Sequence, residues 1–312
     1  MVGAMFEVVT LQEHWPRSLE QMGTKRKFWY AQHNEEEGEP FWLFKYARRG
    51  TGEDWAEKIA EYLCECLGLP HARYELAITE RKEYGVVSPS FLRRGEQLIL
   101  GNQLLATVDP SYAQMRTRYG NSIHSVNAVL TLLAIVDPPR SWILPEGIKT
   151  APEVFVGYLL LDALIGNGDR HDENWGVVAE TTGIQRSLAL TFDHASSMGR
   201  ELTDEARRQK LSTRDQGQSI ATYANRGRSA LYRAVGDKRT LGTVEAFTEA
   251  AIYHRAAAQY WKQSLDKLTP EIFEEGFDQI PSNRISDVAR EFALTLLLHN
   301  QQRLRDVLKL ER

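Results

Sequence analysis

The chain has 312 residues, of which 42% are hydrophobic and 26% are charged, so it can bury a sizeable core in one large domain or two lobes. Its net charge of −4 argues against a protein that coats nucleic acid or adheres to a membrane, because both need a basic surface. The sequence carries no secretory signal, and its apolar runs are too short or too interrupted to span a bilayer. We therefore expect a cytoplasmic protein with no nucleic-acid and no membrane partner.

The first ninety residues are predicted to be mostly strand, with a single helix. The helix is predicted to begin near Thr51 and to stop at Gly68 and Pro70. Thr51 and Asp54, three positions later, resemble a capping box. The strands are rich in aromatic and β-branched residues, and the polar stretch between the first two is typical of a hairpin. They are expected over residues 25–32, 39–47, 74–78 and 83–88, with the hairpin turn over 33–38.

Beyond about residue 95, apolar residues recur every three or four positions, which indicates helices. Pro89 and Gly95 interrupt regular structure between the two patterns, so a hinge is predicted over 89–94. The chain is therefore predicted to have a small β-rich lobe over 1–88 and a larger, mainly helical lobe over 95–312. The clearest helical runs cover residues 125–136, 151–166, 243–265 and 284–308.

Charged residues concentrate in the segment GNGDRHDENWGVV, residues 166–178, directly after one of these helical runs. Its glycines force a tight loop that presents Asp169, with Asn174 five positions later. A returning strand over 188–192 is predicted to deliver Asp193 to the same edge. These oxygen ligands suit Mg²⁺, with Asp169 as the base for an attacking hydroxyl and Asn174 and Asp193 holding the metal on nucleotide phosphates. The alternative is a solvated loop whose Asp and Asn side chains cap turns.

Lys45 is the only charged residue inside the strongly apolar strand segment FWLFKY. A lysine in such a strand must reach solvent or find a partner. In a kinase-type site, a lysine on a central strand neutralises the nucleotide phosphates, and a glutamate of the next helix holds that lysine. Glu57 is the predicted partner, because its neighbours on the helix are small residues that suit a buried ion pair, and Glu61 is the alternative.

The sequence GTKRK precedes the first aromatic strand and has some features of a phosphate-covering loop. Gly23 lets backbone N–H groups approach phosphates at Thr24 and beyond, and Lys25 and Lys27 add positive charge. The segment matches neither the Walker pattern nor G-x-G-x-x-G, so an ordinary basic β-turn is the alternative.

The segments LIGNGDRHDENWGVV and LALTFDHASSMG resemble the catalytic segment of HipA-like serine/threonine kinases. AEKIAEYLCECLGLP resembles the αC segment of this family, GTKRK resembles its phosphate loop, and GVVSPSFLRRGE resembles its hinge. The resemblance implies a bilobal α+β fold of the protein-kinase type, with one αC-type helix in the small lobe, and it implies ATP and Mg²⁺ as cofactors. More distantly, the catalytic segment is similar to that of phosphoinositide 3/4-kinases.

Matched residue by residue, the resemblance also implies Asp169 as the base and Asn174 and Asp193 as the metal ligands. It implies further roles for His171, Val87 and Ser88. His171 is expected to orient the catalytic loop, with a role in proton transfer as the alternative. Backbone groups of Val87 and Ser88 are expected to hold adenine. Lys45 is expected to bind the α- and β-phosphates, and residues 23–27 are expected to cover them.

The sequence also departs from the pattern of the family. Asp193 is followed by His194 and Ala195 in place of Phe and Gly, so control by a flipping phenylalanine is not expected. The resemblance starts near residue 18, so we expect the N-terminal subdomain of full-length HipA to be absent. Asp162 lies in the apolar run before the catalytic loop, and we expect it to hydrogen-bond that loop.

These features predict an ATP-dependent kinase whose acceptor is a Ser or Thr hydroxyl of a protein. The resemblance also implies a toxin–antitoxin context, in which a regulatory or antitoxin partner binds the kinase. A phosphoinositide-type lipid kinase and a small-molecule kinase of the aminoglycoside or choline type share the same site chemistry and are alternatives. An inactive pseudokinase is a further alternative, against which the retention of Lys45, Asp169, Asn174 and Asp193 argues.

Overall fold

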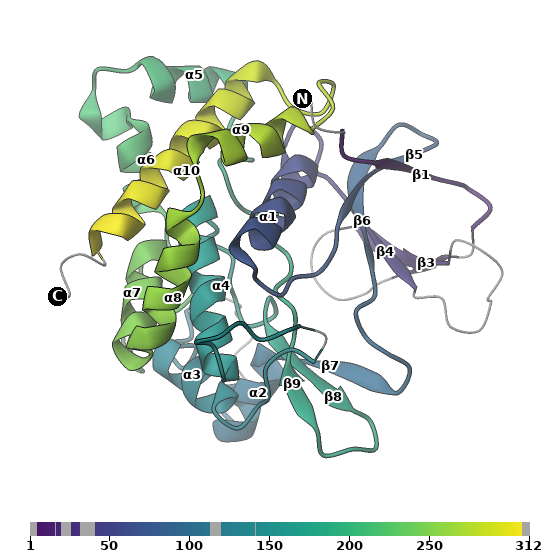
Figure 1. The fold of residues 1–312 in the computed structure, drawn as a ribbon. Coiled ribbons are helices and arrows are strands. Elements are labelled where there is room, and N and C mark those ends of the chain that lie inside the picture. The colour runs from purple at the N-terminus through teal and green to yellow at the C-terminus, as the bar shows by residue number, and fades with distance from the viewer. Residues whose placement is uncertain are drawn as a thin grey trace.

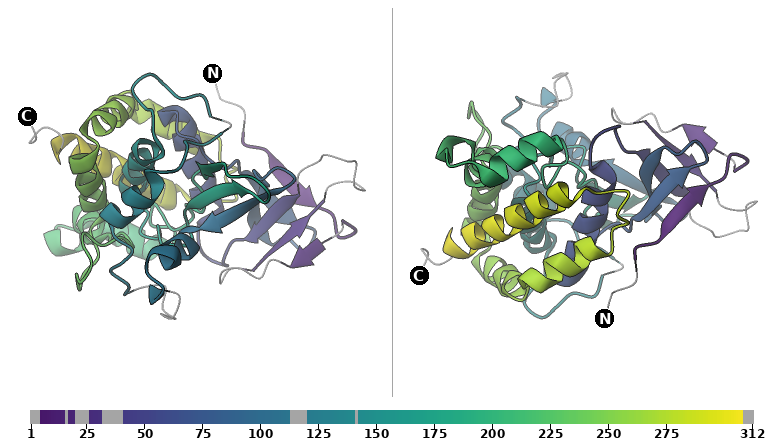
Figure 2. Two further views of the ribbon diagram at one scale, coloured as in Figure 1. Left: turned by 90° about the horizontal axis from the view of Figure 1, so that it is seen from below. Right: turned by 90° about the horizontal axis from the view of Figure 1, so that it is seen from above.

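The computed structural model describes residues 5–15, 17–19, 26–31, 41–112, 120–140 and 142–307. Two lobes lie side by side, with a β-sheet at one end of the molecule and most of the helices at the other (Figures 1 and 2). The predicted α+β class with a strand-rich first part and a helix-rich second part is confirmed. Within the described ranges, no helix is both long enough and apolar enough to cross a membrane.

The small lobe is built on a sheet of six strands, namely β1 (Val8–Leu11), β2 (Arg17–Leu19), β3 (Lys27–Tyr30), β4 (Trp42–Tyr46), β5 (Glu75–Thr79) and β6 (Tyr84–Pro89). Their order is β1-β5-β6-β4-β3-β2, and all neighbours are antiparallel except β1 and β5. Successive side chains point to opposite faces of the sheet. Ala77 and Val87 therefore join Phe44 in an aromatic-rich cluster, whereas Leu76 and Val86 face the main core.

The four predicted strand runs correspond to β3, β4, β5 and β6. The hairpin turn predicted over 33–38 lies outside the described residues. Strands β1 and β2 were not predicted, because each is short and lacks a clear alternation of apolar and polar residues.

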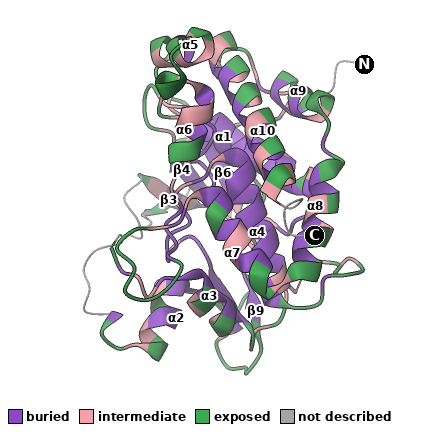
Figure 3. Ribbon diagram, turned by 90° about the vertical axis from the view of Figure 1, so that its left-hand side faces the viewer, coloured by how far each residue is buried: buried purple, intermediate pink, exposed green. Residues whose placement is uncertain are grey.

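Helix α1 (Glu53–Leu67) connects β4 to β5 and ends as predicted at Gly68, whose φ of 73° is left-handed. Its start differs from the prediction. The N-cap is Gly52, and the Thr51 hydroxyl donates to the Arg48 carbonyl at 2.7 Å instead of capping the helix. The capping-box prediction is wrong because residues 48–51 form a tight turn. The helix lies between the sheet and the helices of the large lobe, so nearly its whole surface is buried (Figures 1 and 3).

The large lobe begins with a strand, so the prediction of helices from residue 95 is wrong at this point. Its three strands, in spatial order, are β7 (Glu96–Leu100), β8 (Gly176–Glu180) and β9 (Arg186–Leu188). The partner of β7 lies far along the chain, and local periodicity cannot reveal such a pairing.

The returning strand predicted over 188–192 ends early, at Leu188. Beyond it the chain leaves the sheet and pairs with the segment after α1. The Thr191 N–H donates to the Pro70 carbonyl at 3.1 Å, and the Ala72 N–H donates to the Thr191 carbonyl at 2.9 Å. This pairing, beyond the end of β9, carries Asp193 to the boundary between the lobes.

The rest of the large lobe is helical. Its helices are α2 (Gly101–Val108), α3 (Val126–Leu133), α4 (Ala151–Ile165), α5 (Asp204–Ser212), a 3₁₀ turn (Gln216–Gln218), α6 (Ile220–Arg226), α7 (Thr243–Tyr253), α8 (Arg255–Asp266), α9 (Pro270–Asp278) and α10 (Asp287–Val307). Helix α4 is central and buried, and α7, α8 and α10 pack against it (Figure 3). The run predicted over 243–265 forms two helices, because the backbone of His254 is not helical (φ −133°, ψ 62°).

Several contacts join the lobes. The chain passes from β6 to β7 through residues 90–95, which include most of the predicted hinge. Away from this passage, Arg284 in the α9–α10 loop donates to Asp54 Oδ2 of α1 at 2.9 Å and to the Ala77 carbonyl of β5 at 2.8 Å. The Phe6 N–H also donates to the Gln279 carbonyl at 2.8 Å. The first turn of α1 is therefore fastened to the large lobe.

Candidate active site

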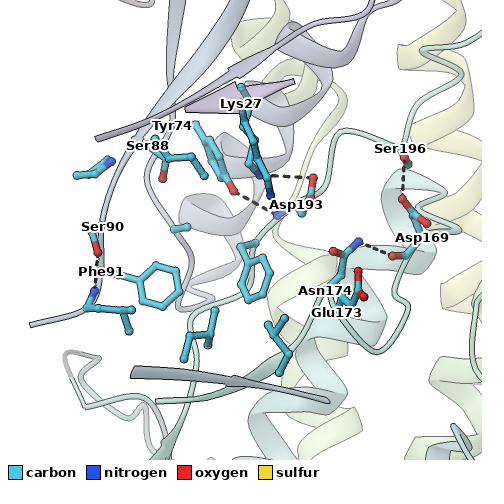
Figure 4. Close-up of a pocket in the computed structure, with 18 of the residues that line it drawn as sticks. Lys27, Tyr74, Ser88, Ser90, Phe91, Asp169, Glu173, Asn174, Asp193 and Ser196 are labelled. Atoms are coloured by element: carbon cyan, nitrogen blue, oxygen red, sulfur yellow. Dashed lines mark hydrogen bonds and ion pairs between the residues drawn. The ribbon is translucent and has the colours of Figure 1, made fainter. Parts of the chain in front are cut away.

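A cavity of about 890 Å³ lies between the two lobes and is bounded by both. The small lobe contributes β3, β4 and the end of β6, and the large lobe contributes β7, the loop after α4 and the segment that contains Asp193 (Figure 4). Of the residues predicted to form the site, those that line this cavity are Lys27, Lys45, Ser88, Asp169, His171, Asn174 and Asp193.

Lys45 projects from β4 into this cavity and is held by two carboxylates. Its Nζ lies 3.5 Å from Asp193 Oδ1 and 4.0 Å from Glu57 Oε2. Burial alone would lower the pKa of Lys45, but Asp193 and then Glu57 outweigh that effect and raise the pKa above its ordinary value. The lysine is therefore a fixed positive charge between the sheet, α1 and the large lobe.

Glu57, and not Glu61, is the carboxylate of α1 that faces Lys45. Glu57 is completely buried and its Oε1 accepts a hydrogen bond from the His194 N–H at 2.6 Å. Burial alone would raise the pKa of Glu57, but Lys45 and His194 hold the pKa below its ordinary value. Glu61 instead accepts hydrogen bonds from Lys58 Nζ at 2.7 Å and from the Tyr74 N–H at 2.9 Å. Burial raises the pKa of Glu61 to about 7.

The loop after α4 is shaped by a buried ion pair. Gly166 ends the helix in the left-handed region, with φ 67°. Asp162 of α4 accepts hydrogen bonds from Arg170 Nε at 2.7 Å and Nη2 at 2.8 Å, and from Asn167 Nδ2 at 2.8 Å. Arg170 also donates to the Asn174 carbonyl at 2.8 Å. The expectation that Asp162 hydrogen-bonds this loop is confirmed.

Asp169 is held in this loop by both its backbone and its side chain. Its N–H donates to Asn167 Oδ1 at 3.1 Å, and its carbonyl accepts from Asn174 Nδ2 at 2.7 Å. The Ser196 hydroxyl donates to Asp169 Oδ2 at 3.2 Å (Figure 4), and His171 Nε2 lies 3.8 Å from Oδ1. Because Asn174 uses its amide nitrogen on the backbone of Asp169, its amide oxygen is the atom left to bind a cation.

Asp193 has an unusual backbone conformation, with φ 60° in the left-handed region, which is rare for a residue other than glycine. Its N–H donates to the Tyr74 hydroxyl at 3.2 Å. The next residue, His194, is fully buried, and its Nε2 lies 2.8 Å from Thr191 Oγ1. His194 therefore occupies the position after Asp193 as a buried link to Glu57.

The remaining predicted site residues divide into three groups. Lys27 and Ser88 line the cavity, whereas the side chain of Val87 does not line it and packs in the aromatic-rich cluster on the other face of the sheet. Gly23, Thr24 and Lys25 lie outside the described residues. Apolar walls of the cavity come from residues that were not predicted, namely Leu43, Phe91, Leu98 and Phe192.

Two polar residues of the cavity, Ser196 and Arg200, were also missed. Both follow Asp193 closely in the sequence, but nothing in their spacing marks them as partners of Asp169. Glu53, which contacts Arg200, was not singled out in the sequence either. Tyr74 appeared only as a residue of a predicted strand.

The oxygen atoms in the cavity fit a magnesium ion. Asp193 offers a carboxylate and Asn174 a carboxamide oxygen, a hard-donor pair that Mg²⁺ accepts when waters and phosphate oxygens complete its coordination. These two residues line the same cavity as Lys45, so a nucleotide there can meet a cationic side chain and ligands for a metal together.

No family model and no curated protein sequence matches this chain. Among solved structures, the Helicobacter pylori proinflammatory kinase CtkA is similar with a TM-score of 0.69 and 18% identity, over 95% of each chain. HipA of Shewanella oneidensis, in a complex with HipB and operator DNA, is similar with a TM-score of 0.56 and 14% identity, over 95% of this chain and 68% of HipA. The chain therefore has the fold of these kinases, and the resemblance to HipA-like kinases seen in the sequence is confirmed at the level of the fold.

Proposed function

We propose that this protein is an ATP-dependent kinase that works in the cavity between its lobes. The observation that carries the proposal is the convergence of Lys45 and Glu57 from one side with Asp169, Asn174 and Asp193 from the other. Phosphoryl transfer needs these elements, namely fixed positive charge at the phosphates, oxygen ligands for a metal and a carboxylate for the acceptor hydroxyl. The fold shared with CtkA and HipA supports the same conclusion.

Each residue has a part in the proposed reaction. Lys45 neutralises the nucleotide phosphates, and Glu57 and Asp193 keep its ammonium group in place. Asn174 and Asp193 hold Mg²⁺, which supplies positive charge to the phosphates when it is bound. Asp169 accepts the proton of the acceptor hydroxyl while that oxygen forms a bond to the γ-phosphorus and ADP leaves. The apolar walls and the end of β6 accommodate adenine.

ATP with Mg²⁺ is expected to raise the melting temperature of the protein. A ligand at one hundred times its Kd stabilises the folded state by about 2.7 kcal/mol, because it binds the folded chain and not the unfolded one. Differential scanning fluorimetry with millimolar ATP measures the shift, with chelation of the metal and the Asp193→Ala variant as controls. No shift and no calorimetric heat of binding would rule out a nucleotide site in this cavity.

The proposed acceptor is a Ser or Thr hydroxyl of a protein. The resemblance to HipA-like serine/threonine kinases motivates this choice, and the basic stretch over 226–233 supports it. A β-carbon at Gly168 would lie 2.6 Å from the Arg228 carbonyl, so this stretch packs directly beside the residue before Asp169. Arg228 and the neighbouring Arg239 offer positive charge there to an acidic segment of a partner. A regulatory or antitoxin-like protein partner is part of the same proposal.

Phosphoproteomics of cells that express either the wild type or Asp169→Asn tests the class of acceptor. We expect Ser and Thr sites on a small number of proteins to be enriched with the wild type alone. Label in lipids or in small molecules, without protein sites, would favour a phosphoinositide-type or small-molecule kinase. Bound ATP without transfer to any acceptor would favour a pseudokinase.

A further inference from the structure

A continuous chain of polar contacts runs from Asp169 to the first turn of α1. The Ser196 hydroxyl donates to Asp169 Oδ2 at 3.2 Å, and Arg200 Nη2 donates to Ser196 Oγ at 3.3 Å. Arg200 Nη1 then forms an ion pair with Glu53 Oε1 at 3.3 Å. Glu53 Oε2 accepts from the Arg48 N–H at 2.8 Å, in the turn before the helix. Four side chains thus connect the loop of the large lobe with the start of α1.

The backbone of Arg200 makes the same connection. The N–H of Gly52, the N-cap of α1, donates to the Arg200 carbonyl at 3.0 Å. The N–H of Met198 donates to the Ile165 carbonyl at 2.9 Å, at the end of α4. The segment that carries Ser196 and Arg200 is therefore fixed both to the helix before the Asp169 loop and to the helix that carries Glu57.

The charges in this chain are largely withdrawn from water. The side chain of Glu53 is 3% exposed, and that of Arg200 is 14% exposed. Buried charges need partners in a definite geometry, because an unpaired one loses its hydration without compensation. The pair therefore has little freedom to rearrange, and the position of α1 constrains where the guanidinium group presents its second nitrogen to Ser196.

We propose that Ser196 and Arg200 are positioning residues that hold the carboxylate of Asp169 in its reactive orientation and make that orientation depend on the seating of α1. The proposal rests on the proposed kinase function. Helix α1 also carries Glu57, which contacts Lys45. The position of this helix therefore determines the positions of both the Lys45 ammonium group and the Asp169 carboxylate.

Ser196→Ala tests the contact with Asp169, and Ser197→Ala is the matched control. Ser197 is buried next to it, and its hydroxyl has no hydrogen-bond partner among the described residues. We expect Ser196→Ala to lower kcat about tenfold, a typical loss for one hydrogen bond to a charged group, and to leave KM for ATP unchanged. Ser196→Thr keeps the hydroxyl and is expected to recover most of kcat, whereas Ser197→Ala is expected to behave as the wild type.

A double-mutant cycle tests the link to α1. Glu53→Gln and Ser196→Ala are measured singly and together, with circular dichroism as the check of folding. If Glu53 acts on Asp169 through Arg200 and Ser196, the loss of kcat in the double variant is smaller than the product of the two single losses. Arg200→Lys keeps the positive charge but cannot contact Ser196 and Glu53 at the same time. This variant replaces Glu53→Gln in the cycle if Glu53→Gln fails to fold.

The outcomes separate the two proposals. A wild type that transfers no phosphate from ATP, tested on lysate acceptors beside Asp169→Asn, overturns the kinase function and this inference with it. An active wild type with an unchanged kcat in Ser196→Ala overturns the positioning role alone. Equal losses in Ser196→Ala and Ser197→Ala, or fully multiplicative effects in the cycle, also overturn it. A selective loss of kcat with recovery in Ser196→Thr and coupling to Glu53 supports it.

Discussion

Replacing Asp169 by asparagine is expected to lower the rate of phosphoryl transfer by about a hundred- to ten-thousandfold, the range associated with loss of a general base. Asparagine keeps the shape of the side chain and an oxygen that can accept from Ser196, so the loop has no reason to rearrange. Binding of ATP is expected to stay close to that of the wild type, because Asp169 is the proposed base and is not one of the proposed metal ligands. A radiolabel transfer assay and isothermal calorimetry measure the two quantities.

Asp193→Ala is the contrasting variant. Asp193 is both a proposed metal ligand and the nearer carboxylate to Lys45, at 3.5 Å. Its removal is expected to abolish the dependence of ATP binding on Mg²⁺ as well as the transfer reaction. If the two variants lost ATP binding to the same extent, the assignment of one carboxylate to the acceptor and the other to the metal would be wrong.

Removal of Asp162 is expected to have the largest effect on stability. Asp162 and Arg170 form a two-bond ion pair in which the side chains keep 5% and 1% of their exposure. Breaking such a pair leaves a buried guanidinium without a counter-charge, and this costs about 3–5 kcal/mol. We therefore expect Asp162→Ala to lower the free energy of unfolding by about this amount in urea denaturation.

Asp266→Ala is the matched control for this measurement. Asp266 pairs with Lys262 at 2.5 Å and with Arg305 at 3.0 Å, but its side chain is 38% exposed. Exposed pairs contribute about 0–1 kcal/mol, so the control is expected to unfold almost as the wild type does. If both variants lost the same free energy of unfolding, the pair of Asp162 and Arg170 would contribute no more to stability than an exposed pair.

The parts of the fold that were predictable from the sequence are those that local patterns specify. Strands β3 to β6 have dense runs of aromatic and β-branched residues, and α1 and α4 end at glycines in the left-handed region. Strand β7 was missed because only its distant partner β8 makes it a strand. The division between α7 and α8 was missed because the apolar periodicity continues through His254 although its backbone is not helical.

The candidate site shows the same division between local and distant determinants. The sequence alone pointed to Asp169, Asn174 and Lys45. Each is a polar residue at a position where the local secondary structure gives no reason for one. The choice between Glu57 and Glu61 needed the third dimension, since it depends on Lys58 and Tyr74 capturing Glu61. The sequence did not reveal Ser196 and Arg200, because their contacts with Asp169 and Glu53 join segments that are far apart along the chain.

The fastening of α1 by Arg284 has a mechanical consequence. The first turn of this helix is tied to the large lobe at Asp54, through the bond to Arg284, and at Gly52, through the carbonyl of Arg200. Because Arg284 also donates to the Ala77 carbonyl of β5, the same guanidinium group holds the helix and the sheet in one arrangement. The 4.0 Å separation between Lys45 Nζ on the sheet and Glu57 Oε2 on the helix is therefore set partly by a contact made outside the cavity, since Arg284 does not line it.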